Sequence, residues 1–486
     1  MQVPFGEWLP DQPDHNKQGA NVANNVYYAA NTYKRFPSLV NYSSNTVSTD
    51  SKGAGSFRDN SNTVYNFVAT RTNIYQLASG AFTSRKASLT GAADDFWTFT
   101  QFGEYVIASN GVDAPQYYLM GTSTNFANLS AIQSAGTVPT FRVSGVVRDF
   151  LVVGNITNAT NRIQWSGIND ITVWSGKQSD SQDLPGSGGQ VVAITSGEVG
   201  YVFRQNQIIR MDYVGGATVF RLSVISPNRG AVFGRTVCQD NRQIFFYADD
   251  GFYQINGDQI MPIGVEKVNR YFDLNLNKAY ADRICAAVDP FNQLAMWLFP
   301  STANTTNTTG ICDKIIIYNY ATKKWSLADA SASTIFSQFV GAFTVELMDI
   351  ISENLENISA ALDTDYWSGG QMFLGGIDSD YKAAIFSGNS NECEVETAEL
   401  EPFPGLRANI TGVRPIVDAT ATLTVKARER LADTESETSS VSMRDSGINP
   451  IRKSGRYVRA NVKVAAGTSF THAQGIDLVA SRAGVR

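Results

Sequence analysis

Short runs of β-branched and aromatic residues, separated by turn-forming residues, recur along most of the chain. The clearest series lies between Ala231 and Ile263, where four such runs are separated by turn sequences that include Asp249-Asp250-Gly251 and Asn256-Gly257-Asp258. Asp-Gly and Asn-Gly favour hairpin turns, because Gly and Asn accept the positive φ that these turns require. The pattern predicts a four-stranded antiparallel meander. Because one meander cannot bury both of its faces, it needs neighbours of the same kind or a place within a sandwich.

Repetition of the pattern decides between these two arrangements. Comparable units begin at Thr63, Asp95, Phe141, Gln190, Ala231, Arg283 and Ile335. Their spacing is centred near the roughly 40–50 residues of a four-stranded propeller blade. We therefore expect a mainly β fold in which residues 51–390 form a six- or seven-bladed β-propeller. The lower number applies if the first or last unit is incomplete or is closed by a strand from elsewhere in the chain.

Four segments depart from the repeat. Residues 1–50 contain several prolines and read as an extended, irregular N-terminal arm. Val265–Tyr280 has helical spacing of apolar residues, and the strongest amphipathic pattern, Glu346–Asp363, predicts a helical insertion at 346–363. That insertion either packs on the propeller rim or contacts a neighbouring subunit. Residues 391–486 combine strand-like runs with prolines and predict a C-terminal β-sandwich-like domain.

Composition limits the classes of function. The chain has 486 residues, of which 17% are charged, and its net charge of −6 provides no broad cationic field for gripping nucleic acid. The N-terminus lacks a basic region followed by an apolar core, and no apolar run is long enough to span a bilayer. The four cysteines show no C-x-x-C pairing, so we expect buried free thiols rather than disulfides or a zinc site: Cys238, Cys285, Cys312 and Cys393.

The residues needed for catalysis do not form a recognisable constellation. His15 and His472 are the only histidines, and the sequence contains none of the common hydrolase, metalloprotease or phosphate-loop motifs. Gly186–Gly189 reads as a flexible inter-blade loop. Two pairs of neighbouring carboxylates, Asp94-Asp95 and Asp249-Asp250, are the candidates for a glycosidase pair, but both lie at turn positions that favour Asp for backbone hydrogen bonding. We therefore predict no enzyme activity and no catalytic, cofactor-binding or metal-binding residues.

Positive charge is concentrated in the C-terminal region. The residues concerned are Arg444, Arg452, Lys453, Arg456 and Arg459. A solvated polar face is the simplest interpretation, and contact with DNA or with an acidic partner surface is the alternative.

Both ends of the chain resemble a known family. The N-terminal segments Asn25-Val-Tyr27 and Tyr33-Lys-Arg-Phe-Pro-Ser-Leu39 resemble the opening of tail proteins from short-tailed bacteriophages. Further motifs follow in the same order: Asp365–Gly370, Ala384–Gly388, Glu396–Leu400, Arg414-Pro415, Ser454–Tyr457, His472–Gly475 and Gly484–Arg486. Together they resemble the tail hub, or nozzle, family, also called packaged-DNA stabilisation proteins. The similarity covers most of the chain, and its weight comes from the order and spacing of the motifs.

The resemblance implies a structural protein of the virion tail, assembled in the host bacterial cytoplasm. It implies a homo-oligomeric ring, a hexamer, below the portal and its adaptor protein. Such a ring continues the double-stranded DNA channel, helps to retain the packaged genome and guides its ejection, and tail fibres or a needle attach to it. A β-propeller that binds or cleaves host glycans as a receptor-recognition protein is the alternative, because propellers serve each of these roles.

Overall fold

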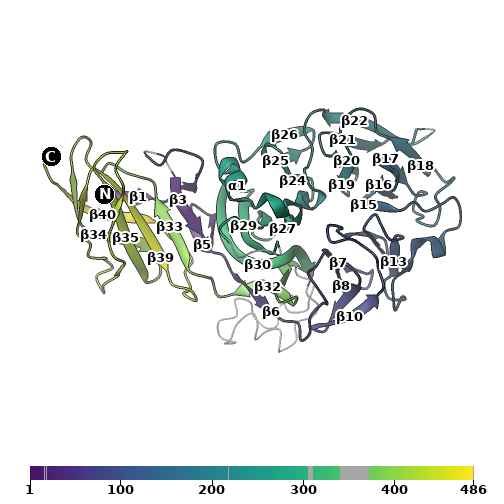
Figure 1. Ribbon diagram of the computed structural model, residues 1–486, viewed down its shortest axis with the longest axis horizontal. Coiled ribbons are helices and arrows are strands. Elements are labelled where there is room, and N and C mark those ends of the chain that lie inside the picture. The colour runs from purple at the N-terminus through teal and green to yellow at the C-terminus, as the bar shows by residue number, and fades with distance from the viewer. Residues whose placement is uncertain (16, 18, 217, 305–309, 340–371, 485–486) are drawn as a thin grey trace.

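Four-stranded antiparallel sheets, the blades of a β-propeller, form the larger part of the fold (Figure 1). The computed structural model describes residues 1–484 except 16, 18, 217, 305–309 and 340–371. Within these residues seven blades surround a common axis, and the first strands of most neighbouring blades contact each other. The prediction of a mainly β propeller is confirmed, with the higher of the two expected blade numbers.

The first five blades are each continuous in sequence. They consist of β7 Gly53–Arg58, β8 Val64–Ala69, β9 Ile74–Ala78 and β10 Ala81–Lys86; β11 Thr98–Phe102, β12 Tyr105–Ser109, β13 Gln116–Leu119 and β14 Ala127–Asn128; β15 Phe141–Val147, β16 Phe150–Ile156, β17 Ala159–Trp165 and β18 Asp180–Asp183; β19 Val191–Ile194, β20 Val199–Arg204, β21 Ile208–Tyr213 and β22 Phe220–Ser226; and β23 Cys238–Asp240, β24 Gln243–Ala248, β25 Gly251–Asn256 and β26 Gln259–Pro262. The fifth blade is the series between Ala231 and Ile263.

Each of the first three blades contains one strand that the apolar pattern misses. β7 begins Gly53-Ala-Gly-Ser, because the innermost strands approach one another closely; a Cβ at Gly53 would lie 2.4 Å from the carbonyl oxygen of Trp97. β14 has only two residues, and every residue of β18 is exposed. Polar edge strands of this kind carry no hydrophobic alternation from which they could be predicted.

The sixth and seventh blades share one long strand. The sixth blade comprises β27 Cys285–Asp289, β28 Leu294–Phe299, β29 Cys312–Asn319 and the first part of β30 Lys324–Phe339. The remainder of β30 is the innermost strand of the seventh blade, followed by β31 Met372–Asp378 and β32 Ala383–Gly388. The outer strand of this blade is β6 Ser38–Asn41, from the N-terminal segment, so the ring is closed by a strand from the other end of the chain.

Residues 1–50 are extended, as expected, but they are not irregular. Besides β6 they carry β1 Gln2–Pro4, β2 Glu7–Trp8, β3 Gly19–Asn24, β4 Val26–Ala29 and β5 Thr32–Arg35. The prolines that argued against a helix lie at strand ends and in connections, where a missing N–H costs little. Because the strands are short and pair with distant segments, no local repeat reveals them.

Residues 391–484 form a β-sandwich together with the N-terminal strands. One sheet has the order β38-β34-β40-β5-β4, with β1 pairing with β40, and the other contains β3, β33, β39 and β35. The C-terminal strands are β33 Cys393–Thr397, β34 Ala408–Val417, β35 Ala421–Arg428, β36 Ser436–Glu437, β37 Val441–Ser442, β38 Lys453–Gly455, β39 Tyr457–Val464 and β40 Ala473–Arg482. In β35 alternate residues are buried, as expected for a strand with one face on a core.

The sandwich and the propeller are joined by β3. This strand pairs with β33 on one side and contacts β30 of the sixth blade on the other, so one hydrogen-bonded sheet runs through both parts. A single apolar core also spans the junction, from Trp297 and Trp325 in the propeller to Val425 and Leu478 in the sandwich.

Within the described ranges, helices are few and short. The helix predicted near Val265–Tyr280 is present as α1 Asn269–Asn275 and the 3₁₀ segment η3 Lys278–Arg283, and Phe272 of α1 packs against Phe252 and Phe299. Two further 3₁₀ turns are η1 Leu129–Ile132 and η2 Gly234–Thr236. The predicted helical insertion at 346–363 lies outside the described residues. No helix in the described part of the chain has the length and apolar character to cross a bilayer.

Candidate functional site in the propeller channel

The two carboxylate pairs considered for glycoside cleavage lie in different blades. Asp95 accepts a hydrogen bond from Arg142 Nη2 at 2.7 Å and another from the backbone N–H of Ala92 at 2.7 Å, and it stabilises the turn before β11. Asp250 lies in the turn between β24 and β25, where Arg229 Nη2 donates at 2.7 Å and the Tyr253 hydroxyl at 2.8 Å. The structure therefore does not bring the two pairs together.

The glycine-rich loop surrounds a buried arginine. Arg204, only 1% exposed, donates from Nε to the carbonyl of Gly189 at 2.9 Å and from Nη2 to that of Gly186 at 3.2 Å. A Cβ at Gly188 would lie 2.8 Å from the Arg204 guanidinium. A phosphate loop presents backbone N–H groups to its ligand, whereas this loop turns its carbonyl groups toward a cation. This close approach explains Gly188, whereas Gly186 and Gly189 have positive φ values of +81° and +80°.

The two histidines lie apart. His15 packs edge-on against Tyr457 with ring centroids 5.0 Å apart, whereas His472 hydrogen-bonds Thr471 through Nδ1 at 2.7 Å. Across the described ranges, no group of three or more His, Cys, Asp or Glu side chains has an arrangement that could hold a metal ion.

The C-terminal basic residues have diverse environments rather than forming one solvated face. Arg444 and Arg452 are exposed. Arg459 is only 8% exposed and forms ion pairs with Glu396 and Glu435, so the expectation of a solvated side chain is wrong for this residue. Asp14 of the N-terminal segment also forms an ion pair with Arg459 at 3.3 Å, a contact that the local sequence of the C-terminal domain does not indicate.

The cysteines are free and buried, as expected. Burial raises the pKa of the Cys238 and Cys285 thiols, although the charge of Arg235 opposes this effect at Cys285. Both thiols stay protonated at neutral pH and are therefore poor nucleophiles. They act as small apolar residues at the start of two innermost strands.

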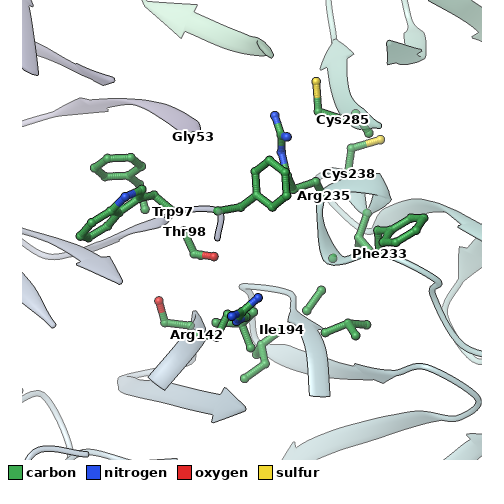
Figure 2. A pocket seen from close by; sticks show the side chains of 18 of the residues that line it. Gly53, Trp97, Thr98, Arg142, Ile194, Phe233, Arg235, Cys238 and Cys285 are labelled. Carbon is green, nitrogen blue, oxygen red and sulfur yellow. The ribbon is translucent and has the colours of Figure 1, made fainter. Parts of the chain in front are cut away.

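A cavity of about 740 Å³ lies along the propeller axis and is lined by residues of all seven blades. Figure 2 shows Arg142 and Arg235 on opposite sides of this cavity, with Trp97 and Thr98 on one wall and Cys238 and Cys285 on another. Since each blade places its first strand innermost, the residues just before these strands meet at one end of the channel. We call this end the entry end.

Charged side chains gather at the entry end. Lys52, 2% exposed, lies with Nζ 3.0 Å from Asp50 Oδ2, and Arg283 Nη1 contacts the same oxygen at 2.5 Å. Burial alone would raise the pKa of Asp50, but the two cations outweigh it and lower that pKa. Burial lowers the pKa of Lys52, and the neighbouring charges of Arg283 and Arg235 lower it further, against the attraction of Asp50.

Arg235 completes the cluster. Its guanidinium stacks on Phe96 at 4.3 Å from the ring centroid, and Nη2 donates to Thr334 Oγ1 at 3.0 Å. In the described part of the chain, Nη1 is buried and has no hydrogen-bond partner, and the same is true of Asp282 Oδ2, which lines the same cavity.

Sequence reasoning missed Lys52, Arg235 and Arg283, because each is an isolated basic residue in its own stretch of sequence. One signal was present: each stands within three residues of the start of an innermost strand, at Gly53, Cys238 or Cys285. In a propeller that position points to the channel, so a search limited to those positions would have found the cluster.

Comparison with known proteins supports no family assignment. No protein-family model matches the chain, and no curated protein is similar to it in sequence. Among solved structures, the chain is similar to a protein in the crystal structure of the mitotic checkpoint complex, with a TM-score of 0.40 and 10% identity over 74% of this chain and 98% of that one. It is also similar to BamB from Moraxella catarrhalis, with a TM-score of 0.37 and 10% identity over 75% of this chain and 96% of that one.

Proposed function

We propose that this protein is a structural subunit of a short-tailed bacteriophage tail, a hub or nozzle that forms a ring below the portal and its adaptor. The ring continues the DNA channel, helps to retain the packaged genome and guides its ejection. The observation that carries the proposal is that four of the motifs that resemble this family are neighbours in the sheets, although they come from both ends of the sequence. The motif Asp365–Gly370 lies outside the described residues.

Three pairs of these motif segments are neighbours in the sheets. Leu39, in the Tyr33–Leu39 segment, pairs with Phe386 in Ala384–Gly388. Tyr33 itself pairs with Ala473 in His472–Gly475. Val26 and Tyr27, in the Asn25–Tyr27 segment, pair with Arg35 and Lys34 in Tyr33–Leu39. Sequence features that coincide at one interface support a shared architecture more strongly than scattered matches.

The continuous sheet and core through the junction suit a mechanical role. A nozzle must hold its shape while DNA under pressure passes it. Residues 1–41 supply strands to both the propeller and the sandwich, so neither part can shift without breaking backbone hydrogen bonds.

The charge balance suits DNA that slides rather than binds. Affinity for duplex DNA depends on the number of phosphates that Lys and Arg neutralise. A subunit with a net charge of −6 makes few such contacts, so it offers DNA little resistance to movement.

A surface for assembly is provided by the turn between β27 and β28. Phe291, at its tip, is 83% exposed and lies beside a cavity of about 620 Å³ that also involves Phe36, Leu374 and Phe386. A large exposed aromatic residue next to an apolar hollow is typical of a protein–protein contact. In our proposal a neighbouring subunit of the tail covers it.

The test is assembly with the portal and adaptor of the same phage, followed by mass measurement and negative-stain imaging. We expect rings of the wild-type chain on the portal–adaptor complex, and weaker ring formation by Phe291→Asp. Leu274→Asp is the matched control, because Leu274 is 64% exposed on α1, away from that cavity. A chain that remains monomeric on every portal–adaptor preparation would overturn the proposal, as would strong, salt-sensitive binding of duplex DNA by the isolated protein.

A further inference from the structure

The turn before the outer strand of the fifth blade carries an exposed Asn-Gly pair. Asn256 is the last residue of β25 and is exposed, and its pairing with Gln259 leaves Gly257 and Asp258 as the turn before β26. We propose that Asn256 is a modification site, at which attack by the chain's own backbone converts the side-chain amide to a carboxylate. The inference does not depend on the proposed role in a phage tail.

The reaction needs only the chain and water. The backbone nitrogen of Gly257 gives up its proton to the solvent and attacks Cγ of Asn256, which forms a new N–C bond. The bond from Cγ to Nδ2 breaks, and Nδ2 takes up a proton from water and leaves as ammonia. Water then opens the cyclic imide at either carbonyl group and leaves aspartate or isoaspartate at residue 256. Glycine favours the attack, because a nitrogen without a neighbouring Cβ approaches closely.

The described residues leave the Asn256 amide unrestrained. In this part of the chain its side chain forms no hydrogen bond or ion pair. Gly257 lies outside the strand ladder, so its N–H makes no cross-strand hydrogen bond that the attack would break. No atom lies within 4 Å of the position of a Cβ on Gly257, so the turn has room for the cyclic imide.

The attack requires the turn to open briefly, and the position of the turn favours opening. The strand that follows it, β26, is the outer strand of its blade, has four residues and pairs only with β25. Short strands at the edge of a sheet open locally more readily than strands in its middle. Two contacts oppose opening: the Tyr201 hydroxyl donates to the Gly257 carbonyl at 2.7 Å, and Arg210 pairs with Asp258. These contacts therefore limit the rate of the reaction.

The other Asn-Gly pair in the sequence, Asn110-Gly111, is protected. Asn110 is fully buried, and its Oδ1 accepts hydrogen bonds from the backbone N–H groups of Val112 and Asp113 at 3.0 Å and 2.8 Å. Its Nδ2 donates to Asp113 Oδ2 at 2.8 Å. Attack on Cγ would disrupt these buried hydrogen bonds. The same dipeptide therefore reacts at one place in the propeller and is held unreactive at the other.

The product changes the turn in two ways. A carboxylate at residue 256 adds one negative charge to a chain whose net charge is already −6. Isoaspartate also lengthens the main chain by a methylene group, which a short turn between paired strands does not accommodate. We therefore expect β26 to lose its pairing with β25 in the isoaspartate product.

Peptide mapping of the aged full chain tests the assignment. The folded protein is kept at mildly alkaline pH and physiological temperature and is then digested with trypsin, which cleaves after Arg242 and Lys267. Mass spectrometry follows the peptide of residues 243–267 for the gain in mass that replacement of NH₂ by OH gives. We expect Asn256 to convert at least about tenfold faster than Asn110. In urea, where both pairs are unfolded, the two rates should become similar.

Two variants relate the rate to the structure. Gly257→Ala should slow conversion by about tenfold, because the added Cβ hinders approach of the nitrogen. Tyr201→Phe removes the hydroxyl that holds Gly257 and should accelerate conversion by about threefold. Tyr213→Phe, in the same blade as Tyr201, is the matched control and should convert at the wild-type rate.

The comparison of the two sites within the wild-type chain needs no variant to fold. The proposal is overturned if Asn256 keeps its amide in the folded chain while the unfolded chain reacts, or if Asn110 and Asn256 convert at equal rates in the folded chain. Conversion of folded Gly257→Ala at the wild-type rate would also contradict it. An unchanged rate in Tyr201→Phe would overturn the role of turn opening.

Discussion

The fifth and seventh blades have the same four-stranded architecture but obtain it in opposite ways. The fifth blade, β23 to β26, is continuous from Cys238 to Pro262, and each of its strands pairs with the next along the chain. The seventh blade combines the end of β30, the strands β31 and β32, and β6 from the N-terminal segment. One blade is built from local contacts and the other from contacts between the two ends of the chain.

This difference separates what a sequence repeat specifies from what closes the ring. A local hairpin has a low entropic cost, because few residues are ordered to bring its strands together. Pairing of Val40 with Ile385 requires most of the chain to be in place first. We therefore expect damage to the fifth blade to have moderate effects, and damage to the N-terminal strands to affect the whole molecule.

Removal of residues 1–41 should have the largest effect. The truncation deletes the outer strand of the seventh blade and β1 to β5 of the junction and sandwich. The expected loss exceeds about 5 kcal/mol, which is comparable to the total stability of many domains. The truncated chain should lack the cooperative thermal transition that circular dichroism detects for the full chain.

A synthetic peptide of residues 1–41 provides the control for that truncation. Because β6 adds to the edge of β32 and β3 fits between β30 and β33, strands that the rest of the chain supplies, the peptide added in trans should restore part of the transition. A truncated chain that melts like the full chain would contradict the view that the N-terminus closes the ring.

Glu396 connects the two ends through buried charge, and its loss should have the second largest effect. The side chain of Glu396 is 1% exposed; it accepts a hydrogen bond from Asn21 Nδ2 at 2.9 Å and forms ion pairs with Lys426 and Arg459. Glu396→Ala removes the buried carboxylate that these three groups share, although Arg459 keeps its ion pair with Glu435, and we expect a loss of about 3 kcal/mol in urea unfolding.

The matched control is Glu392→Ala, directly before the strand that carries Glu396. Glu392 is 57% exposed and pairs with Lys463 at 3.1 Å, so its removal should cost less than about 1 kcal/mol. If both variants lose the same amount of stability, burial of the carboxylate does not explain the contribution of Glu396 to stability.

Within the fifth blade, Gly251→Ala should have a moderate effect. Gly251 has a φ of +134° in the turn between β24 and β25, and a Cβ there would lie 1.9 Å from Asn269 Nδ2. We expect a loss of about 1–3 kcal/mol, measured by urea unfolding. Gly257→Ala in the next turn is the control: its φ is +62° and no atom lies within 4 Å of the added Cβ, so it should cost less. An equal loss in both variants would show that backbone strain, and not the contact with α1, accounts for the lost stability.

The same contrast explains which parts of the fold were predictable from sequence. The fifth blade and most strands of the other blades follow from local apolar runs and turn residues. The strand β6 does not, because Ser38–Asn41 gives no sign of its partner Ala384–Gly388. The dual role of β30 was hidden for the same reason, since a single strand that serves two blades reads as two separate runs.

The candidate site was less predictable than the fold. Its charged residues come from three loops, before β7, β23 and β27, and only ring closure brings Lys52, Arg235 and Arg283 together. The sequence drew attention instead to adjacent pairs such as Asp94-Asp95 and Asp249-Asp250. Residues that are adjacent in sequence are a weak guide to this site, because the residues that line the channel come from different blades.

Asp418, like Glu396, connects segments that are distant in sequence, but its side chain is only partly buried. It accepts hydrogen bonds from the backbone N–H groups of Thr471 and His472 at 3.1 Å and 3.0 Å, so it joins two turns of the sandwich that are distant in sequence. Burial alone would raise the pKa of Asp418, but these hydrogen bonds and that from the Thr471 hydroxyl lower it to about 2. Its side chain is 29% exposed, unlike that of Glu396.

Because the folded pKa of Asp418 lies below its ordinary value of 3.8, its contribution is present above about pH 4 and is lost as the pH falls toward 2. After allowance for solvent screening we expect this contribution to be about 1 kcal/mol, the smallest of the effects considered. Asp418→Asn should therefore lose about that much stability at neutral pH and match the wild type near pH 2, as measured by urea unfolding at a series of pH values. A loss as large as that of Glu396→Ala would mean that separation along the chain, rather than burial, sets the cost of breaking a contact between distant segments.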